Sequence, residues 1–532
     1  MNPTLILHNA KIYTVDPTRP WAGAVACTGG TITAVGDSAD ILPLAGPKTV
    51  VIDAGGKLVL PGLTDSHVHF LQYAIRRHQV SLFGLADISE ALARVRQAAD
   101  HHPAGLWLQG WGWNEHHWDT PPTAALLDTV APDVPVALAR MDMHTWWVNS
   151  AALKLAGITR HTPDPPEARI ERDSDGNPTG LLREWNAIAL VERHIGRPDN
   201  ATLRQWLAEA ITSVHRLGLT AIHDQRVERE GRQSLRLLQS LRRDGQLKLR
   251  VHANIAADFL PEAATLGLQP GFGDDLLWLG HVKAFADGTM GSQTAWMLAP
   301  FEGSAENTGI VVTPMAELGD LADRAAQAGF SLSVHAIGDR AVREVAAVLS
   351  EFPPNAEAGQ LPHRIEHVQI IHPDDLATLA RHNIYASVQP VHLHTDWPTA
   401  DKVWGERARY AYAFASLLAQ GTPLALGSDA PVAPINPMLS IHAALTRQDE
   451  RNQPANGWHP AERIGLPEII HGFTLAPARL AGKAARQGSV TMGKWADLVI
   501  LNQNLFEIDP AEVKDVTVDA TVFNGELVYR AG

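Results

Sequence analysis

The sequence predicts a mixed α/β fold: a (β/α)8 TIM barrel with a small β-sandwich domain built from both termini and a large insertion after barrel strand 1. Short buried apolar runs, each followed by an amphipathic helical segment, recur eight times in the middle of the chain. Both ends alternate apolar and polar residues with the period of two that is typical of half-buried strands. A long tryptophan-rich stretch separates the first apolar run from the second.

The eight expected barrel strands each end near glycine or polar residues, at 58–65, 219–224, 248–254, 279–285, 330–335, 364–368, 384–388 and 423–428. The segments between them have the features of helices. Asn200 is a suitable N-cap, the apolar residues within 203–214 keep to one face, and Gly218 follows the end. A last helical segment near 466–482 completes the repeats of a barrel.

Three regions follow from this pattern. Residues 1–57 and 484–532 each carry too few strands for a stable sheet alone, so we expect them to form one composite β-domain. Residues 58–483 form the barrel. Residues 70–218 form an inserted subdomain within it, which leaves the first strand at its carboxyl end and is therefore expected to cover the active-site mouth.

Composition excludes several classes of protein. The 532 residues carry 44 Lys+Arg against 58 Asp+Glu, a net charge of −14, and no basic run, so nucleic acid is not an expected partner. One cysteine, Cys27, rules out an intrachain disulfide and a cysteine-rich zinc site. The 25 histidines are then the natural ligands for a metal ion such as zinc. No secretion signal or run of about 20 apolar residues is evident, so the expected location is cytoplasmic.

A His-x-His pair stands at the end of the first expected strand. Residues two apart on a strand point to the same side, so His67 and His69 can direct two imidazoles at one metal ion. The spacing alone is a weak signal, because His392 and His394 share it. Further ligand-type residues at the carboxyl ends of other expected strands strengthen it, namely Lys283, His335, His367 and Asp429.

With these residues in place, the chain resembles the amidohydrolase superfamily of metal-dependent hydrolases, and within it the large amidohydrolases that include N-substituted formamide deformylases. The resemblance covers nearly the whole chain and is carried by residues 62–70, 282–288, 334–340, 364–367 and 427–432, with 140–153 and 493–497 in addition.

The resemblance implies a binuclear metal site. His67, His69 and Asp429 would hold one divalent ion, expected to be zinc, and His335 and His367 the second. Lys283 would bridge the two ions as a carboxylated lysine, since a free ammonium is a poor neighbour for cations. Two alternatives stay open: Lys283 as a buried amine paired with Asp287, and a site with a single metal.

Metal chemistry then suggests the reaction. A metal lowers the pKa of bound water to about 7, so a metal-bound hydroxide is available to attack a carbonyl at neutral pH. Asp429 would be the catalytic residue that takes the proton of the water and returns it to the leaving nitrogen. The plainer alternative is a helix N-cap after the last strand.

Five further residues are candidates for substrate binding: His144, Asn149, Trp113, Gln389 and His394. The alternatives for the first two are capping and packing roles, and for the tryptophans packing within a lid. His392 is interpreted as structural. Glu366 is expected to point away from the site and to be a structural partner of Arg364 or of a helix. Taken together, the many tryptophans favour a hydrophobic or aromatic substituent on the substrate.

The sequence therefore predicts a metal-dependent hydrolase that cleaves a non-peptide C–N bond of an amide or N-substituted formamide. Deamination, hydrolysis of a carbamate, ester or cyclic amide on the same site, and a catalytically silent ligand-binding barrel are the alternatives. The expected partner is a small-molecule amide, with a homodimer left open.

Overall fold

The structure is a computed structural model that describes residues 2–85, 87–103, 105–115, 118–141, 144–166, 168–226, 230, 232–357 and 359–532. The chain forms two compact units. One comprises Met1–Phe70 together with Leu207–Gly532, and the other comprises Leu71–Trp206. None of the helices within the described ranges is long and apolar enough to cross a membrane.

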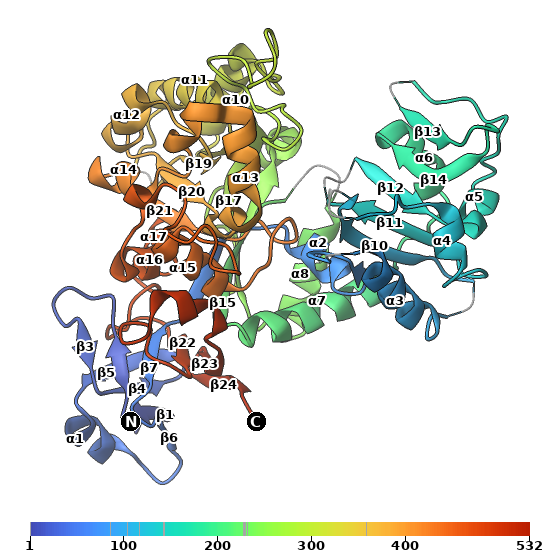
Figure 1. The fold of residues 1–532 in the computed structure, drawn as a ribbon. Helices are drawn as coiled ribbons and strands as arrows, with labels where there is room; N and C mark the ends of the chain where they lie inside the picture. Colours follow the sequence, from blue (N-terminus) through green and yellow to red (C-terminus); the bar gives the residue numbers. More distant parts are fainter. Residues whose placement is uncertain are drawn as a thin grey trace. The chain divides into compact units, whose positions relative to one another are not determined.

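The first unit contains a barrel of eight parallel strands (Figure 1). In chain order they are β8 (Leu63–Val68), β15 (Leu219–Asp224), β16 (Arg250–Ala256), β17 (Leu277–Phe285), β18 (Leu332–Ala336), β19 (Arg364–His367), β20 (Tyr385–Val388) and β21 (Leu424–Leu426). Each strand pairs with the next in register. The ring closes where the His69 amide donates to the Ala430 carbonyl at 2.8 Å and the Asp429 amide donates to the His67 carbonyl at 2.7 Å. The predicted (β/α)8 barrel is confirmed.

One expected strand is divided. Residues 58–61 form β7 (Leu58–Pro61), which pairs with β2 and β22 of the terminal domain, so the barrel begins at Leu63 and not at residue 58. Gly62 makes the transition. Its amide donates to Asp497 of the terminal domain at 2.8 Å, and the next amide, of Leu63, donates to Gly218 at 3.1 Å. A Cβ on Gly62 would lie 2.2 Å from Oγ1 of the buried Thr220 in β15, so any larger residue would have to displace that side chain.

Helices return the chain between the barrel strands. They are α7 (Asn200–His215), α8 (Gln233–Arg243), α9 (Leu260–Thr265), α10 (Met315–Gln327), α11 (Asp339–Glu351), α12 (Leu376–Arg381), α13 (Leu393–Trp404), α14 (Phe414–Ala419), α15 (Pro437–Thr446), α16 (Leu466–Gly472) and α17 (Leu475–Leu480). In α10 the apolar residues Leu318, Leu321 and Ala325 are buried, as their spacing predicts. At the start of α7 the cap is Asp199, one residue before the expected Asn200, because the Asp199 carboxylate accepts from the Thr202 amide at 2.8 Å.

Both termini build the small β-domain. One sheet contains β1 (Leu5–His8), β4 (Ala24–Thr28), β5 (Thr31–Gly36) and β6 (Val50–Asp53); the other contains β2 (Lys11–Tyr13), β3 (Trp21–Ala22), β7, β22 (Leu498–Leu501), β23 (Val518–Phe523) and β24 (Glu526–Arg530). The short helix α1 (Ser38–Ile41) follows β5. Leu7 and Cys27 of the first sheet share one buried cluster with Val59 and Leu498 of the second. The two inner faces therefore pack as a sandwich.

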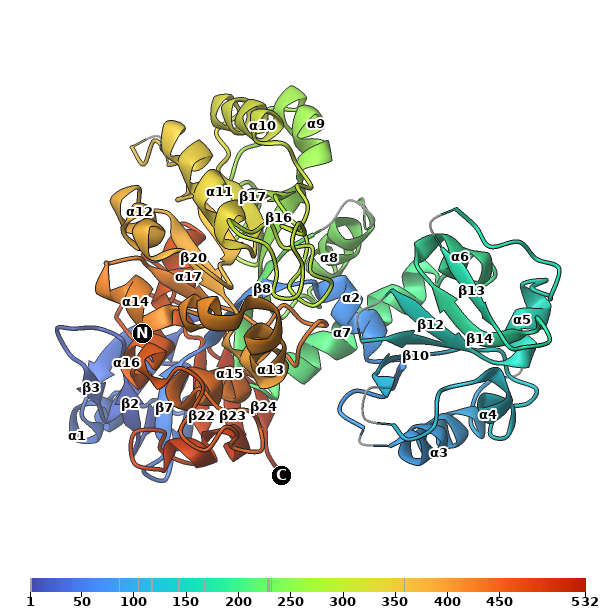
Figure 2. The ribbon, with the colours of Figure 1, turned by 45° about the horizontal axis from the view of Figure 1, so that its top comes forward.

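The second unit is a six-stranded sheet with helices on both faces. After α2 (Phe70–Arg76) come β9 (Val80–Ser81), α3 (Ile88–Ala99), β10 (Leu108–Trp113), α4 (Ala124–Asp128), β11 (Val136–Arg140), β12 (Thr145–Val148), α5 (Ser150–Leu155), β13 (Arg169–Arg172), β14 (Pro178–Arg183) and α6 (Trp185–Glu192). Leu138 packs with Val95 of α3, and its neighbour Ala137 with Ile188 of α6. Figure 2 shows α3 and α6 on opposite sides of this sheet. The unit thus has cores of its own, and its expected position over the mouth stays a prediction.

A buried ion pair joins the barrel to the terminal domain and gives a stability test. Arg250 of β16 and Asp497 are both buried, with Nε to Oδ2 at 2.6 Å and Nη2 to Oδ1 at 3.1 Å. Arg250→Ala leaves a buried carboxylate unpaired, so we expect a loss of about 3 kcal/mol in the free energy of unfolding, measured by urea titration with circular dichroism.

Arg242→Ala is the matched control. Its Nε also lies 2.6 Å from a carboxylate, that of Asp274, but these side chains are 42% and 43% exposed. Its expected cost is below about 1 kcal/mol. Equal losses in the two variants would contradict the structural role of the Arg250 pair.

Candidate metal centre

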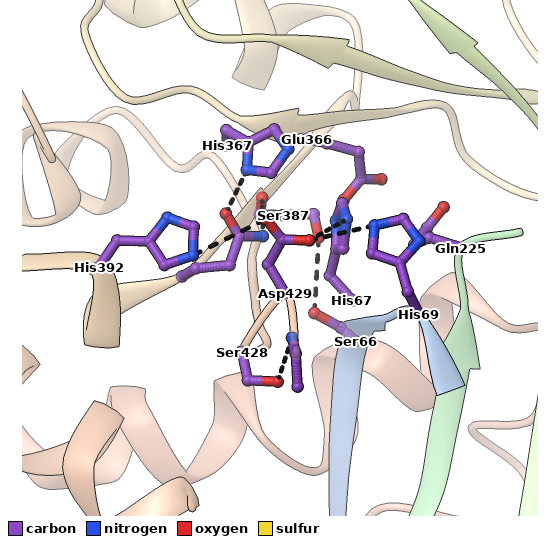
Figure 3. A network of polar contacts seen from close by, with 12 residues as sticks. Ser66, His67, His69, Gln225, Glu366, His367, Ser387, His392, Ser428 and Asp429 are labelled. Carbon is purple, nitrogen blue, oxygen red and sulfur yellow. Dashed lines mark hydrogen bonds and ion pairs between the residues drawn. The ribbon is translucent and has the colours of Figure 1, made fainter. Parts of the chain in front are cut away.

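Residues far apart in the sequence meet at the carboxyl ends of the barrel strands. The Nε2 atoms of His67 and His69, at the end of β8, lie 3.3 and 3.2 Å from the same oxygen, Asp429 Oδ1. One ligand atom each of His67, His367 and Asp429 lies within 4.8 Å of the other two. Figure 3 shows these side chains directed toward Asp429. This spacing is short enough for one cation to touch all three groups.

The other two expected ligands border this cluster. The His335 ring lies 4.6 Å from the His367 ring between centroids, and the His67 and His367 rings are 4.9 Å apart. Lys283 of β17 is fully buried, and its Nζ has no hydrogen-bond partner among the residues that the structure describes. A buried ammonium without a hydrogen-bond partner is costly, so this position favours loss of the proton or covalent modification of the amine.

Hydrogen bonds fix which nitrogen each histidine presents. His67 Nδ1 lies 2.6 Å from Glu366 Oε2, and His367 Nδ1 lies 2.7 Å from Gln389 Oε1. Each Nδ1–H therefore donates to an oxygen, which leaves the Nε2 lone pair of the neutral ring facing the cluster. His67 Nε2 and Asp429 Oδ1 are then both hydrogen-bond acceptors, and they lie 3.3 Å apart. Only a proton or a cation between them makes this contact favourable, so the donor set fits a metal ion.

Charges in the cluster suit the same role. Burial would raise the pKa of Asp429, but His67, His69 and His367 hold it well below its usual range. Burial, followed by the charge of Lys283, lowers the pKa of His335 to about 3. Burial lowers the pKa of Lys283 to about 8 against the opposing effect of Glu366 and Asp429. Near neutral pH the site therefore combines an anionic carboxylate with a neutral imidazole.

Backbone conformation explains how two consecutive residues serve one site. Glu366 and His367 would face opposite sides of a regular strand, and the sequence pattern predicts that Glu366 points away. His367 has a φ of 74° and Val368 a φ of 45°, so the strand alternation ends at Glu366. Glu366 pairs with Arg364, as expected, and also holds His67. The prediction that it points away from the site is wrong.

Beneath the cluster, a buried polar network holds Glu366. Arg364 donates from Nη2 to Glu366 Oε2 at 3.0 Å, to the Ser66 carbonyl at 2.6 Å and to Ser387 Oγ at 2.6 Å. Ser333 Oγ donates to Glu366 Oε1 at 2.6 Å. Arg364 and Glu366 are fully buried, and Arg364, followed by His67, holds the pKa of Glu366 well below its usual range. The carboxylate that orients His67 is therefore itself fixed.

The alternative pairing of Lys283 with Asp287 is not observed. Asp287 accepts hydrogen bonds from three backbone amides, those of Ile337, Gly338 and Trp296, at 2.8 to 3.0 Å. It organises the loops that follow β17 and β18, and its Oδ1 also lies 3.5 Å from His335 Nε2.

The two histidines after β20 lie in different surroundings, and their roles toward substrate stay predictions. His392, interpreted as structural, is buried, and its Nε2 lies 3.8 Å from Asp429 Oδ2 (Figure 3). His394, a candidate for substrate binding, lies instead beside His442, with ring centroids 5.8 Å apart, and 3.6 Å from Glu450. The 3-10 turn Pro390–His392 and the start of α13 rotate the two rings apart, because the pair does not lie on a strand. Gln389 reaches the cluster through His367, as described above.

The candidates in the second unit have local roles. Trp113 is buried, donates from Nε1 to the Leu138 carbonyl at 2.8 Å and stacks with Trp118 at 6.0 Å. Asn149 is the N-cap of α5, and its amide donates to Ala131 and Val134, both at 2.8 Å. The structure thus favours the packing and capping alternatives for these two residues over contact with substrate. His144 lies 2.9 Å from Glu184, and its binding of substrate stays a prediction.

A barrel that gathers imidazoles and a carboxylate at the carboxyl ends of its strands has the architecture of a hydrolase of amidohydrolase type. The chain belongs to the amidohydrolase family, whose sequence model matches residues 50–529. It is thus a hydrolase that acts on carbon–nitrogen bonds, in a family of generally metal-dependent enzymes with small-molecule substrates.

Relatives span the whole chain. The putative amidohydrolase YtcJ of Bacillus subtilis (strain 168) is 30% identical over 531 residues, covering 99% of both chains. An N-substituted formamide deformylase of Arthrobacter pascens is 28% identical over 548 residues, covering 99% of this chain and 98% of the deformylase. The crystal structure of an uncharacterized metal-dependent hydrolase from Pyrococcus furiosus is 27% identical with a TM-score of 0.75, covering 95% of this chain and 99% of that one.

The hydrogen bond from His67 to Glu366 predicts a metal-affinity effect. In Glu366→Gln the carboxylate is replaced by an amide of the same shape, so the His67 ring is oriented less strongly. We expect Zn²⁺ affinity to fall by about 10- to 100-fold, measured by competition with a chromophoric chelator. Glu526→Gln removes an exposed carboxylate paired with Lys248 and is the control. Unchanged affinity in a folded Glu366→Gln protein would contradict this role.

Proposed function

We propose that this protein hydrolyses the C–N bond of N-substituted formamides, releasing formate and an amine, with two divalent cations at the barrel's strand ends, for which Zn²⁺ is the ion that best matches the ligands. The observation that carries the proposal is the convergence of His67, His69 and His367 on Asp429. The buried amine of Lys283, which has no hydrogen-bond partner in the described part of the chain, adds to it. The formamide as substrate is supported by the full-length similarity to the deformylase of Arthrobacter pascens.

In this proposal His67, His69 and Asp429 hold one cation, and His335 and His367 hold the other. Lys283, if carboxylated on Nζ, would supply two anionic oxygens to both cations. Burial of Nζ without a hydrogen-bond partner among the described residues supports this assignment. When bound, the cations lower the pKa of water and polarise the formyl carbonyl.

Asp429 moves the proton. Its Oδ1 faces His67 and His69, whereas Oδ2 faces His392 at 3.8 Å and is the oxygen left to accept a proton. Asp429 takes one proton from the attacking water as the oxygen bonds to the formyl carbon. It then delivers that proton to the nitrogen as the C–N bond breaks, so the amine leaves neutral. Asp429 has a φ of 61°, a strained backbone conformation of the kind that is frequent at functional sites.

Asp429→Asn and metal removal test this function. The amide of asparagine cannot accept the proton, so kcat/KM for N-benzylformamide should fall by about 10³-fold. Chelation should abolish activity, and Zn²⁺ with bicarbonate should restore it. Metal analysis of the active protein should give about two ions per chain.

Asp375→Asn is the matched control, because Asp375 pairs with Arg343 on the outer helices at 2.8 Å. It should keep full activity. A metal-free, chelator-resistant activity, or an Asp429→Asn enzyme as active as the wild type, would exclude the proposed mechanism.

A further inference from the structure

A preference for an apolar substituent needs a surface next to the metal centre. Three of the tryptophans that suggest this preference from the sequence are packing residues: Trp113 and Trp147 are fully buried, and Trp118 packs against both. They fill the core of the second unit. These three tryptophans are therefore not a surface that selects the substituent, and the rim of the barrel offers another apolar surface.

Phe285, the last residue of β17, stands beside the proposed ligands. It lies two residues after Lys283 on the same strand, so both side chains point to the same side. It is paired in register with His335 of β18, and the two rings are 5.3 Å apart between centroids. Lys283 Nζ lies 4.8 Å from the centre of the Phe285 ring. The Phe285 ring therefore lies closer to the carboxyl end of β17 than Lys283, the residue proposed to bridge the two cations.

Phe285 is also the residue of β17 that is left partly open. All eight residues before it in the strand, 277–284, are buried, whereas Phe285 is partly exposed. An aromatic ring that contacts a proposed ligand on one side and is accessible on the other is placed to contact a substrate bound at the cations.

An apolar strip continues from Phe285 along the rim. The Val312 amide donates to the Ala286 carbonyl at 2.8 Å, and Val311 forms an antiparallel bridge with Asp287. Ile310, Val311 and Val312 are 50%, 41% and 49% exposed. These three consecutive β-branched residues place exposed apolar surface next to the end of β17.

We infer that Phe285, with the strip Ile310, Val311 and Val312, is the wall that binds the N-substituent of the substrate and selects aromatic or branched alkyl groups over small or charged ones. This inference rests on the proposed function, since it assigns the specificity of the same site. The formyl group reaches the cations, and the substituent on nitrogen extends outward along β17 past the ring. A charged substituent is disfavoured, because the strip offers it no hydrogen-bond partner.

The experiment compares two substrates in three holoenzymes. N-benzylformamide and N-methylformamide are assayed with the wild type, Phe285→Ala and Phe285→Leu, each with its metal content measured. The wild type should favour the benzyl substrate in kcat/KM by about 100-fold. Phe285→Ala should lose most of this preference, about 30-fold, mainly through a higher KM for the benzyl substrate. N-methylformamide should change little, and Phe285→Leu should fall between.

Leu266→Ala is the matched control. Leu266 is 73% exposed and follows α9, which returns the chain toward the amino ends of the strands, opposite the metal centre. It should leave the substrate preference unchanged. A Phe285→Ala enzyme with normal metal content and an unchanged preference would overturn the inference.

A second measurement separates the inference from the proposed function. If the metal-loaded wild type hydrolyses neither formamide, the proposed function fails. Calorimetric binding of benzylamine and methylamine to the same holoenzymes then tests the wall alone. Tighter binding of benzylamine that is lost in Phe285→Ala supports the wall, whereas equal binding of both amines by the wild type overturns it.

Discussion

The candidate metal centre depends on the seam where the first and last barrel strands meet. Asp65 holds this seam: it accepts from the His67 and Ser428 amides, both at 3.0 Å, and from Ser428 Oγ at 2.5 Å. At Gly427 a Cβ would lie 2.5 Å from the His67 amide nitrogen, so the two segments approach as closely as backbone allows. This contact sets the His67 imidazole against the Asp429 carboxylate, which lies far along the chain, before any ion binds.

The fold could be predicted because each barrel strand is a short buried run with a helix behind it, a pattern that sequence carries locally. What the pattern could not supply is the sheet to which a buried run belongs. Residues 58–61 and 63–68 are both buried throughout, and it is the pairing of the first run with β2 and β22 that assigns it to the terminal domain. Partner choice between two buried sheets is a tertiary property and leaves no local signal.

The carboxyl ends of barrel strands converge, so the sequence could predict that His67, Lys283 and Asp429 belong to one candidate site. Residues whose orientation depends on irregular backbone could not be. Glu366 faces the cluster because the chain turns left-handed at His367. His392 lies near Asp429, whereas His394 does not, because the pair begins on a 3-10 turn and not on a strand. Residues two apart on such a turn do not point to the same side. On such a turn, the His-x-His spacing does not tell which of the two rings faces the site.

Stability and chemistry oppose each other inside this barrel. Arg364 and Glu366 are charged groups with no exposed surface, and desolvation of each costs several kcal/mol, which only a complete set of hydrogen bonds offsets. The left-handed φ angles at His367 and Asp429 add about 1 to 3 kcal/mol of strain each. In exchange for these costs, the His67 ring is already oriented, so less ordering is needed when a cation binds. A centre fixed so deeply tolerates little change, whereas the apolar side chains of Phe285 and residues 310–312 make no hydrogen bond that a substitution would break. Substitutions there can alter which amide is accepted and leave the cluster intact, which is how one barrel serves many substrates.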